Sequence, residues 1–440
     1  MGSRHTGGLV PKLYLVSLGC SKNLVDSEVM LGRLANYDLT QEINLADVII
    51  INTCGFIQAA KEESVRVLLE AINGRKEGAL VVASGCLSER YKKQLAAELP
   101  EIDIFTGVGD YDRIDALLTS KQSQFSKRVF LAGEQKRTIT GSKVHAYVKL
   151  SEGCNQNCSF CAIPSFKGRL QSKSIERILK EVEILAKQGF SDISFIAQDS
   201  SSYLLDQNVK DGLIKLIKAI DTQQMIKSAR IFYLYPTSTT LELIESIANS
   251  PIFANYFDMP IQHISDRMLK TMRRNSNKAN HLKLLEAMHA IPNRFLRTTL
   301  LLGHPHENSS DIEELQDFLQ SFSFDRINLF AFSAEENTAA YKWPQLSQED
   351  ISARLDQINP LIEQQVQNSM QGLVGQTLEV IVEGLSEDGL FLKARDRRWG
   401  LEIDGEVLIN ESLLEQTPPG YYKALCHTYR EGVLLGRIVG

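Results

Sequence analysis

Short apolar runs alternate with helical segments along most of this chain, and this alternation constrains the fold more than any other feature. The runs LYLVSL (13–18), DVIII (47–51) and ALVVAS (79–84) are continuously apolar, as are strands covered on both faces, and each precedes a helical pattern. A βαβα order predicts a parallel sheet with right-handed crossovers. The other elements predicted here are helices at 22–37, 56–73, 87–97 and 111–118 and a strand at 102–106.

The polar stretch 119–143 predicts a linker, with one short strand, VFLA, inside it at 129–132. After the linker the alternation starts again with six βα units, fewer than the eight of a closed TIM barrel, so we expect an open, partial barrel. A long helix at 347–370 then ends at Gly372. The predicted strands are 144–150, 192–197, 229–234, 256–259, 295–302 and 326–332, and the helices between them are 175–188, 211–221, 239–248, 265–290 and 309–321.

From residue 371 onward, five short β runs separated by turn signals predict a small antiparallel β-barrel. The fold class is therefore α/β with three domains. We expect an open parallel-sheet domain with its linker at 1–140, a partial (βα)6 barrel at 141–370 and the small β-barrel at 371–440. Residues 1–11 are Gly-rich and polar and are expected to be a disordered leader.

The net charge is −6, with 48 Lys and Arg against 54 Asp and Glu, so the chain lacks the general basic field of nucleic-acid binders. It has no apolar run of about 18 residues, and its N-terminus lacks the apolar stretch of a signal peptide. We therefore expect a cytoplasmic protein without membrane contact. In a reducing compartment its seven cysteines are ligands, catalysts or core residues rather than a disulfide framework.

Three of the cysteines, Cys154, Cys158 and Cys161, lie within eight positions directly after a predicted strand. We call these three the triad. Thiolates at this spacing can hold one metal centre and leave a further position on the metal open for substrate. The alternative is a structural zinc site completed by His145 or His263, although structural zinc usually has two paired ligand sets.

Cys20, Cys54 and Cys86 form a second set, which we call the N-terminal set. Each lies within two or three residues of the carboxyl end of its predicted strand, and in an open parallel sheet those ends line one edge. The three thiolates are therefore expected to converge, unless they are three independent core cysteines. A glycine beside each cysteine lets the backbone approach a bulky inorganic centre. These glycines are Gly19, Gly55 and Gly85.

The triad pattern, Cys-x3-Cys-x-aromatic-Cys after the first strand of a partial barrel, resembles the signature of radical S-adenosylmethionine (SAM) enzymes. The resemblance implies that the triad binds a 4Fe-4S cluster whose fourth iron is chelated by SAM. One electron from the cluster then cleaves SAM into methionine and a 5′-deoxyadenosyl radical. Phe160 either packs near the SAM adenine or is buried within its own loop, whereas Gly153 and Asn155 suit a tight loop.

Both cysteine sets and the C-terminal barrel together resemble the methylthiotransferases, whose terminal barrel is called TRAM, over residues 12–440. The branch that modifies an aspartate of small-subunit ribosomal protein twelve, the RimO type, is indicated by the segments SLGCSKNLVDSE, NTCGFI, YVKLSEGCNQNCSFCAIPSFKGRLQSKS, IAQDSSSY and FDMPIQHISDRMLKTMRR. The tRNA-modifying branch more often has Phe-Gly-Cys with Gln-Met-Asn at the first cysteine, and Ser-Val-Arg after Asn-Thr-Cys.

The resemblance implies that the radical removes a hydrogen from the β-carbon of the aspartate, and that the cluster on the N-terminal set presents a methylated sulfur for transfer. Two SAM molecules serve these two roles, and both clusters should open into one cavity. The implied partners are small-subunit ribosomal protein twelve, free or in the assembled subunit, an electron donor such as flavodoxin or ferredoxin, and a sulfur donor. Nucleic acid is not the expected substrate. The rival functions are methylthiolation of tRNA adenosine and a zinc-stabilised RNA-binding protein without chemistry.

Two loops on the carboxyl face of the partial barrel depart from the family pattern. The usual Gly-Phe-Pro-Gly-Glu-Thr is Gly-His-Pro-His-Glu-Asn at 303–308, and the usual Tyr-Pro-His-Gly is Tyr-Pro-Thr-Ser at 235–238. We expect the two new histidines, His304 and His306, to be solvated rather than metal ligands. The cysteines are unaffected by these changes.

Several polar residues near predicted strand ends are weaker candidates. Arg297 interrupts an apolar strand and must be paired, either with the SAM carboxylate or with an internal acid. Gln198, a candidate SAM contact, and Asp199 end the second barrel strand, and Gln262 and His263 follow the fourth. Residues in these positions belong to the active site or make capping and loop hydrogen bonds.

The terminal barrel is acidic, with 7 Lys and Arg against 11 Asp and Glu between residues 371 and 440. Such a module is poorly suited to RNA phosphates and suits a basic partner, which ribosomal proteins are. We therefore hypothesise that the barrel docks the substrate protein, with Trp399 beside Arg397 and Arg398 as an anchor. Alternatively, Trp399 covers the end of the barrel. Cys426 has no partner in the sequence and is expected in the core.

Overall fold

The structure is a computed structural model that describes residues 10–414 and 416–440. It divides into two compact units. The first runs to Ile139 and includes Ala162–Gly168, and the second comprises Thr140–Cys161 and Arg169–Gly440. The three-domain boundaries stay a prediction, and residues 1–9 of the expected leader lie outside the described residues. No helix in the described ranges is both long and apolar enough to cross a membrane.

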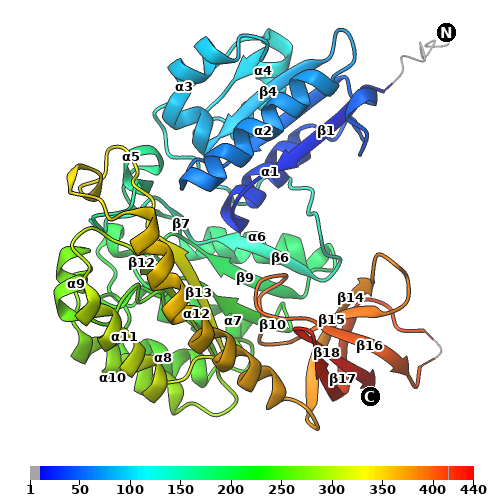
Figure 1. The fold of residues 1–440 in the computed structure, drawn as a ribbon. Helices are drawn as coiled ribbons and strands as arrows, with labels where there is room; N and C mark the ends of the chain where they lie inside the picture. Colours follow the sequence, from blue (N-terminus) through cyan, green and yellow to red (C-terminus); the bar gives the residue numbers. More distant parts are fainter. Residues whose placement is uncertain (1–9, 415) are drawn as a thin grey trace. The chain divides into compact units, whose positions relative to one another are not determined.

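The first unit is built on one parallel sheet, drawn in blue and cyan in Figure 1. Its elements are β1 (Lys12–Ser17), α1 (Ser21–Arg33), β2 (Asp38–Leu39), η1 (Ile43–Leu45), β3 (Val48–Thr53), α2 (Gln58–Gly74), β4 (Leu80–Gly85), α3 (Cys86–Glu98), β5 (Ile104–Phe105), η2 (Tyr111–Arg113), α4 (Ile114–Ser120) and α5 (Ile163–Lys167). The strand order is β2-β1-β3-β4-β5, and every neighbouring pair is parallel. Every residue of β3 is buried, which explains its continuously apolar sequence. The predicted open parallel sheet is confirmed.

The short strand predicted at 129–132 is absent from the described structure. Phe130 and Ala132 of this segment are buried, but the segment pairs with no strand. The nearest pairing is one isolated bridge between Thr106 and Gln124. The prediction was wrong because apolar side chains can be buried from an irregular backbone as well as from a strand.

In the described residues the second unit holds two three-stranded sheets, a two-stranded sheet of β7 and β8, and a closed barrel. Its elements up to the last long helix are β6 (His145–Lys149), β7 (Ser151–Glu152), β8 (Gln171–Ser172), α6 (Ile175–Lys187), β9 (Asp192–Ile196), η3 (Leu205–Gln207), α7 (Gly212–Gln223), β10 (Ser228–Ile231), α8 (Leu241–Ala248), β11 (Tyr256–Asp258), α9 (Asp266–Thr271), α10 (Lys278–His289), β12 (Phe295–Leu302), α11 (Ser309–Ser321), β13 (Arg326–Ala331), η4 (Ala340–Lys342) and α12 (Gln348–Gln371).

Six parallel strands form the predicted open, partial barrel. They pair as β6-β9-β10 and β11-β12-β13, and one parallel bridge, Ala229 to Phe253, links β10 to the segment before β11. The single helix predicted at 265–290 is two helices, α9 and α10. Left-handed backbone at Arg273 and Asn275 breaks it, and Asn277 begins α10 by accepting a hydrogen bond from the backbone of Asn280 at 2.8 Å.

The C-terminal strands close into a barrel in the order β14-β15-β16-β18-β17, drawn in orange and red in Figure 1. They are β14 (Thr377–Leu385), β15 (Leu392–Asp396), β16 (Val407–Ser412), β17 (Gly420–Arg430) and β18 (Val433–Ile438). The small barrel is confirmed, but β16 and β18 pair in parallel rather than antiparallel. Cys426 is buried in β17, as expected for a core residue.

A buried charge network joins this barrel to the strands of the partial barrel. Asp192 on β9 accepts two hydrogen bonds from Arg230 on β10, at 2.7 and 2.9 Å, and one from Arg395 on β15 at 2.6 Å. Burial works against ionisation of Asp192, but the two arginines hold its pKa below the usual range. Arg395 also pairs with Glu383 at 2.9 Å. The pairing of all these charges makes their burial tolerable.

We predict that Arg395→Met lowers the free energy of unfolding by about 3 kcal/mol, because it leaves the buried carboxylate of Asp192 and the half-buried one of Glu383 with fewer partners. Chemical denaturation followed by circular dichroism measures the change. The matched control is Arg430→Met, since Arg430 pairs with Glu431 on the exposed surface and should change stability by no more than about 0.5 kcal/mol. Equal stability of the two variants would contradict the prediction.

Candidate functional site

The cysteines of the N-terminal set lie at the carboxyl ends of three adjacent strands. Cys20 caps the start of α1, three residues beyond β1; Cys54 directly follows β3; and Cys86 directly follows β4 and begins α3. Because β1, β3 and β4 are neighbours in one parallel sheet, these positions share one edge. The described structure therefore places the three residues along one edge of the sheet.

Close backbone approaches show how tightly this edge is built. A Cβ placed on Gly19, whose φ is +83°, would lie 2.6 Å from the Sγ of Cys54. A Cβ on Gly55 would lie 3.0 Å from the carbonyl carbon of Cys86. Burial raises the pKa of the Cys54 thiol, and the nearby Cys20 adds to the effect. Glycine is therefore required where the chain segments that carry the cysteines come together.

The triad lies in the irregular segment that follows β7, and all three of its side chains are partly buried. Asn155 fixes this segment by accepting a hydrogen bond from the backbone of Leu170 at 3.2 Å. The backbone N–H of Gln156 points at the Sγ of Cys154 at 3.4 Å. These two hydrogen bonds thus help to fix the loop that carries the triad sulfurs.

Ser159 anchors the triad loop from three directions. Its backbone N–H donates to Met272 at 3.0 Å, its carbonyl accepts from Ala340 at 2.8 Å, and its hydroxyl lies 2.9 Å from Nε2 of His304. Burial lowers the pKa of His304 to about 4, so its ring is neutral. Because Nδ1 lies 2.9 Å from the carbonyl of Pro305, Nδ1 carries the proton and Nε2 accepts from Ser159.

His304 is therefore a buried hydrogen-bonding residue, and the expectation that it is solvated was wrong. His306, by contrast, is exposed. Phe160 lies against a buried apolar cluster with Met268, Met272 and Phe332, which supports the packing alternative for this side chain. Its role beside adenine stays a prediction.

The sulfurs and their surroundings fit an iron-sulfur cluster. Burial raises the pKa of the Cys154 thiol to about 12, so a bound metal must displace its proton. Nη1 of Arg274 lies 3.3 Å from the Sγ of Cys158. A positive charge therefore lies beside the sulfur that would be a thiolate in a cluster. In the described ranges no three His, Cys, Asp or Glu side chains converge closely enough for a single metal ion. A four-iron cluster separates its thiolates further than one zinc ion does, so both sets remain compatible with clusters.

Other polar residues gather at the base of the triad loop. Lys149, at the end of β6, pairs with Glu152 at 2.7 Å, and both side chains are buried. Gln198 donates to the same carboxylate through Nε2. Asp199 accepts from Gln156 at 2.9 Å, which ties the loop to the end of β9. Gln198 and Asp199 therefore make loop hydrogen bonds, and contact of Gln198 with SAM stays a prediction.

Beyond the fourth strand, Gln262 adopts a left-handed backbone with φ of +69°. His263 is buried, and its Nδ1 accepts from the backbone of Ile264 at 2.9 Å and of Ser265 at 3.0 Å. Since burial also lowers the pKa of His263 to about 4, we interpret this ring as a neutral loop cap.

Arg297 pairs with two internal acids, Asp258 at 3.3 Å and Asp404 at 3.2 Å. Of the two alternatives for Arg297, the structure supports the internal partner, so a role for it in holding the SAM carboxylate is not supported. Arg297 lies on β12 and Asp404 on the connection between β15 and β16. This second buried network again links the partial barrel to the C-terminal barrel.

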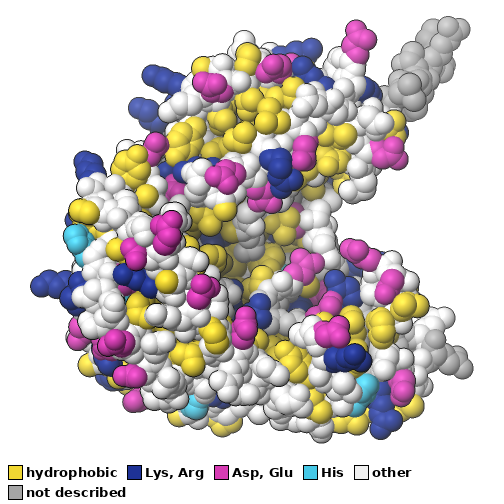
Figure 2. All heavy atoms as spheres, in the orientation of Figure 1, with side chains coloured by type: hydrophobic (Ala, Val, Ile, Leu, Met, Phe, Trp, Pro, Cys, Tyr) yellow, Lys and Arg dark blue, Asp and Glu magenta, His cyan; other side chains and the backbone are white. Residues whose placement is uncertain are grey.

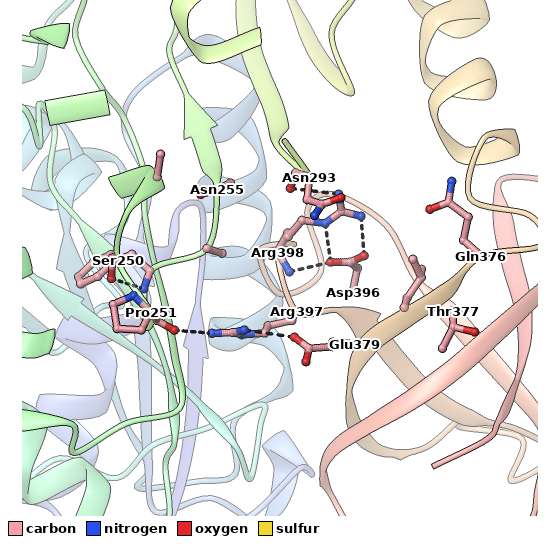
Figure 3. A pocket seen from close by; sticks show the side chains of 14 residues that line it. Ser250, Pro251, Asn255, Asn293, Gln376, Thr377, Glu379, Asp396, Arg397 and Arg398 are labelled. Carbon is pink, nitrogen blue, oxygen red and sulfur yellow. Dashed lines mark hydrogen bonds and ion pairs between the residues drawn. The ribbon is translucent and has the colours of Figure 1, made fainter. Parts of the chain in front are cut away.

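Trp399 is fully buried and lies against Phe295 with ring centroids 6.1 Å apart, so it cannot anchor a partner at the surface. The structure supports the alternative that Trp399 covers the end of the barrel. Figure 3 shows that the neighbouring arginines are also engaged, beside a pocket of about 420 Å³. Arg397 pairs with Glu379 at 3.1 Å and donates to the carbonyl of Pro251 at 3.2 Å. Arg398 pairs with Asp396 at 2.7 Å.

Sequence reasoning missed Arg274 and Tyr235 as neighbours of the triad. Arg274 lies in a segment that resembles the family and Tyr235 in a loop that departs from it, but nothing in the sequence spacing connects either residue to Cys158. Only the fold brings the turn after α9 and the loop after β10 to the triad.

Comparison with known families agrees with this geometry. Residues 12–107 match the model of "Uncharacterized protein family UPF0004", and residues 148–319 match the "Radical SAM superfamily". The N-terminal set lies within the first match and the triad within the second.

Two curated relatives extend over nearly the whole chain. The "Ribosomal protein uS12 methylthiotransferase RimO" of Helicobacter pylori (strain ATCC 700392 / 26695) is 58% identical over 431 residues, which is 97% of this chain and 98% of the relative. The protein of the same name from Wolinella succinogenes is 58% identical over 416 residues, 94% of this chain and 95% of the relative. This chain belongs to the RimO family.

Solved structures that resemble the chain are more distant and show the fold alone. The radical S-adenosylmethionine methyltransferase TsrM from Kitasatospora setae, with cobalamin and a 4Fe-4S cluster bound, has a TM-score of 0.53 at 11% identity. The match covers 73% of this chain and 75% of TsrM. The cobalamin-dependent radical enzyme OxsB has a TM-score of 0.50 at 13% identity, over 81% of this chain and 56% of its own. The RimO-family chain thus shares its architecture with radical SAM enzymes of low sequence identity.

If the N-terminal set holds a 4Fe-4S cluster, as the resemblance implies, Gly19→Ala should lower the iron content by about four per chain, because the new methyl group would displace the Cys54 sulfur. Iron and acid-labile sulfide are measured after anaerobic reconstitution. Gly78→Ala is the matched control, since Gly78 has a similar φ of +79° but no atom within 4 Å of the added Cβ. Full iron content in Gly19→Ala would show that the close approach is not needed for binding.

Proposed function

We propose that this RimO-family chain transfers a methylthio group to the β-carbon of an aspartate in ribosomal protein uS12, using a 4Fe-4S cluster on each cysteine set. Family membership at 58% identity over nearly the whole chain supports a radical SAM methylthiotransferase. The observation that carries the two-cluster proposal is the placement of Cys20, Cys54 and Cys86 along one edge of the sheet. A radical SAM enzyme with one cluster has no need of that second convergent set.

The chain's own residues hold and shield the cofactors. When bound, the clusters and SAM supply the electron, the hydrogen-abstracting radical and the methylthio group. The triad provides three thiolates, and the anchors of Ser159 and Asn155 keep its loop in place. Glycine at Gly19 and Gly55 lets the N-terminal set close around its cluster. That both clusters open into one cavity stays a prediction.

The proposal includes partners that the chain must meet. The triad cluster needs a low-potential electron donor such as flavodoxin or ferredoxin, and the transferred sulfur needs a donor. Because its proposed substrate is a ribosomal protein, either free or in the assembled subunit, we expect the enzyme to act in the cytoplasm.

The central test measures metal and product together. We expect about eight irons per reconstituted chain, falling to about four when either cysteine set is replaced by alanine, because each set holds its cluster separately. Mass spectrometry should then show uS12 with one hydrogen replaced by a methylthio group only with the parent chain. Modified tRNA with unmodified uS12 would contradict the proposed substrate, and bound zinc without iron would contradict the chemistry.

We further propose that the acidic C-terminal barrel docks uS12 at the end that carries the β14–β15 hairpin. Three of its seven basic residues, Arg395, Arg397 and Arg398, are engaged with acids and carbonyl groups, so they add little positive charge to its surface. Strand register brings the hairpin tip and the end of β16 to one end of the barrel. Figure 2 shows acidic side chains interspersed with hydrophobic and basic ones on the visible face of this barrel.

This end of the barrel combines charge with exposed apolar side chains. Glu387, Asp388 and Glu411 are exposed there. The leucines exposed at the same end are Leu385, Leu390, Leu413 and Leu414. A surface of acids and leucines suits a basic protein, because the charges steer the encounter and apolar contacts retain the partner.

The variant Glu387→Lys/Asp388→Lys/Glu411→Lys should raise KM for uS12 at least tenfold at low salt and leave kcat unchanged, because only docking is affected. The difference should shrink as salt screens the charges. A control with the same change in net charge replaces three exposed acids of the partial barrel, Glu183, Glu242 and Glu245, by lysine. An equal rise in KM in both variants would show that the effect comes from net charge alone, and this would contradict the docking proposal.

A further inference from the structure

A buried arginine points at one sulfur of the triad. Arg274 follows α9 and is only 4% exposed. Its Nη1 lies 3.3 Å from the Sγ of Cys158, and its Nη2 donates to the carbonyl of Pro260 at 2.6 Å. Because one nitrogen is held by Pro260, the guanidinium plane is fixed and the other nitrogen is directed at the sulfur.

Tyr235 holds the arginine from a second side. The guanidinium lies over the Tyr235 ring, 4.2 Å from its centroid. The Tyr235 hydroxyl donates to the backbone carbonyl of Arg274 at 3.0 Å and lies 3.6 Å from the Sγ of Cys158. The arginine and the tyrosine thus form one rigid arrangement around a single triad sulfur.

The charge of Arg274 bears on electron transfer to the triad. Reduction adds one negative charge to a cluster that thiolates already make anionic, and hydrogen bonds to its sulfurs and nearby net charge set its potential. A fixed guanidinium beside a ligand sulfur stabilises the reduced form more than the oxidised form, and its burial weakens screening by water. A neutral side chain at this position would leave the reduced cluster less stable.

We propose that Arg274 is a positioning residue that raises the reduction potential of the triad cluster through its hydrogen bond to Cys158. Tyr235 holds the guanidinium in place for this interaction. The inference rests on the proposed function, since it needs a cluster on the triad. It assigns to Arg274 the role of making reduction of the triad cluster by the electron donor more favourable.

The test is a redox titration of the triad cluster alone. The full-length chain carries Cys20→Ala, Cys54→Ala and Cys86→Ala, so the only remaining cluster is on the triad. The reduced cluster is followed by electron paramagnetic resonance without SAM. In this background Arg274→Met and Arg274→Gln should each lower the equilibrium constant for reduction at least tenfold, a shift of about 59 mV for one electron. Arg274→Lys keeps the charge and should recover part of the loss.

Arg273→Met is the matched control, because Arg273 is adjacent, equally charged and exposed. It should leave the potential within twofold of the parent in equilibrium constant. Tyr235→Phe should lower the potential less than Arg274→Met, since it keeps the ring under the guanidinium and loses only the hydroxyl. If Arg274→Met does not retain iron, the polar Arg274→Gln supplies the same measurement.

The outcomes separate this inference from the proposed function. Absence of iron from the parent background would overturn the proposed triad cluster itself. About four irons per chain with an unchanged potential in the Arg274 variants would overturn the inference alone. Loss of iron from both Met and Gln variants, with iron retained in Arg273→Met, would also overturn it, because Arg274 would then be required for assembly instead.

Discussion

The structure depends on a property of parallel sheets, namely that the carboxyl ends of neighbouring strands meet at one edge. In the first unit this property places Cys20, Cys54 and Cys86 together although they are more than 30 residues apart in sequence. In the partial barrel the same property gathers the triad loop after β6 and β7, Gln198 after β9 and Tyr235 after β10. Both cysteine sets therefore lie at the carboxyl ends of parallel strands, although the triad comes from one loop and the N-terminal set from three strands.

Several buried side chains on the strands of the partial barrel have partners beyond that barrel. The C-terminal barrel supplies these partners. Arg395 pairs with Asp192, Asp404 pairs with Arg297, and Trp399 lies fully buried against Phe295. Removing these charges from water is tolerable because each meets an opposite charge and further hydrogen bonds. Trp399 and Asp404, in the connection between β15 and β16, are thus part of the core.

Residue patterns predicted most of the fold and the cysteine sites. Continuous apolar runs indicate buried strands, and closely spaced cysteines after a strand indicate a loop that can bind a metal centre. The six strands of the partial barrel were predicted close to their observed bounds, and the five strands of the C-terminal barrel were predicted in number. What the sequence could not resolve in the sites were partners that are distant along the chain. Two alternatives stayed open for Trp399 and two for Arg297, because a sequence does not show that Phe295 and Asp404 approach them. Arg274 escaped notice for the same reason.

The surroundings of the triad combine a fixed loop with accessible sulfurs. Ser159 is buried and held by Met272, Ala340 and His304, whereas the cysteines on either side of it are only partly buried. His304 replaces the phenylalanine usual in the family pattern, and its buried ring is tolerated because both nitrogens have partners. A neutral histidine here adds a hydrogen bond to the loop without adding a charge. The charge beside the triad comes instead from Arg274, which contacts a sulfur directly.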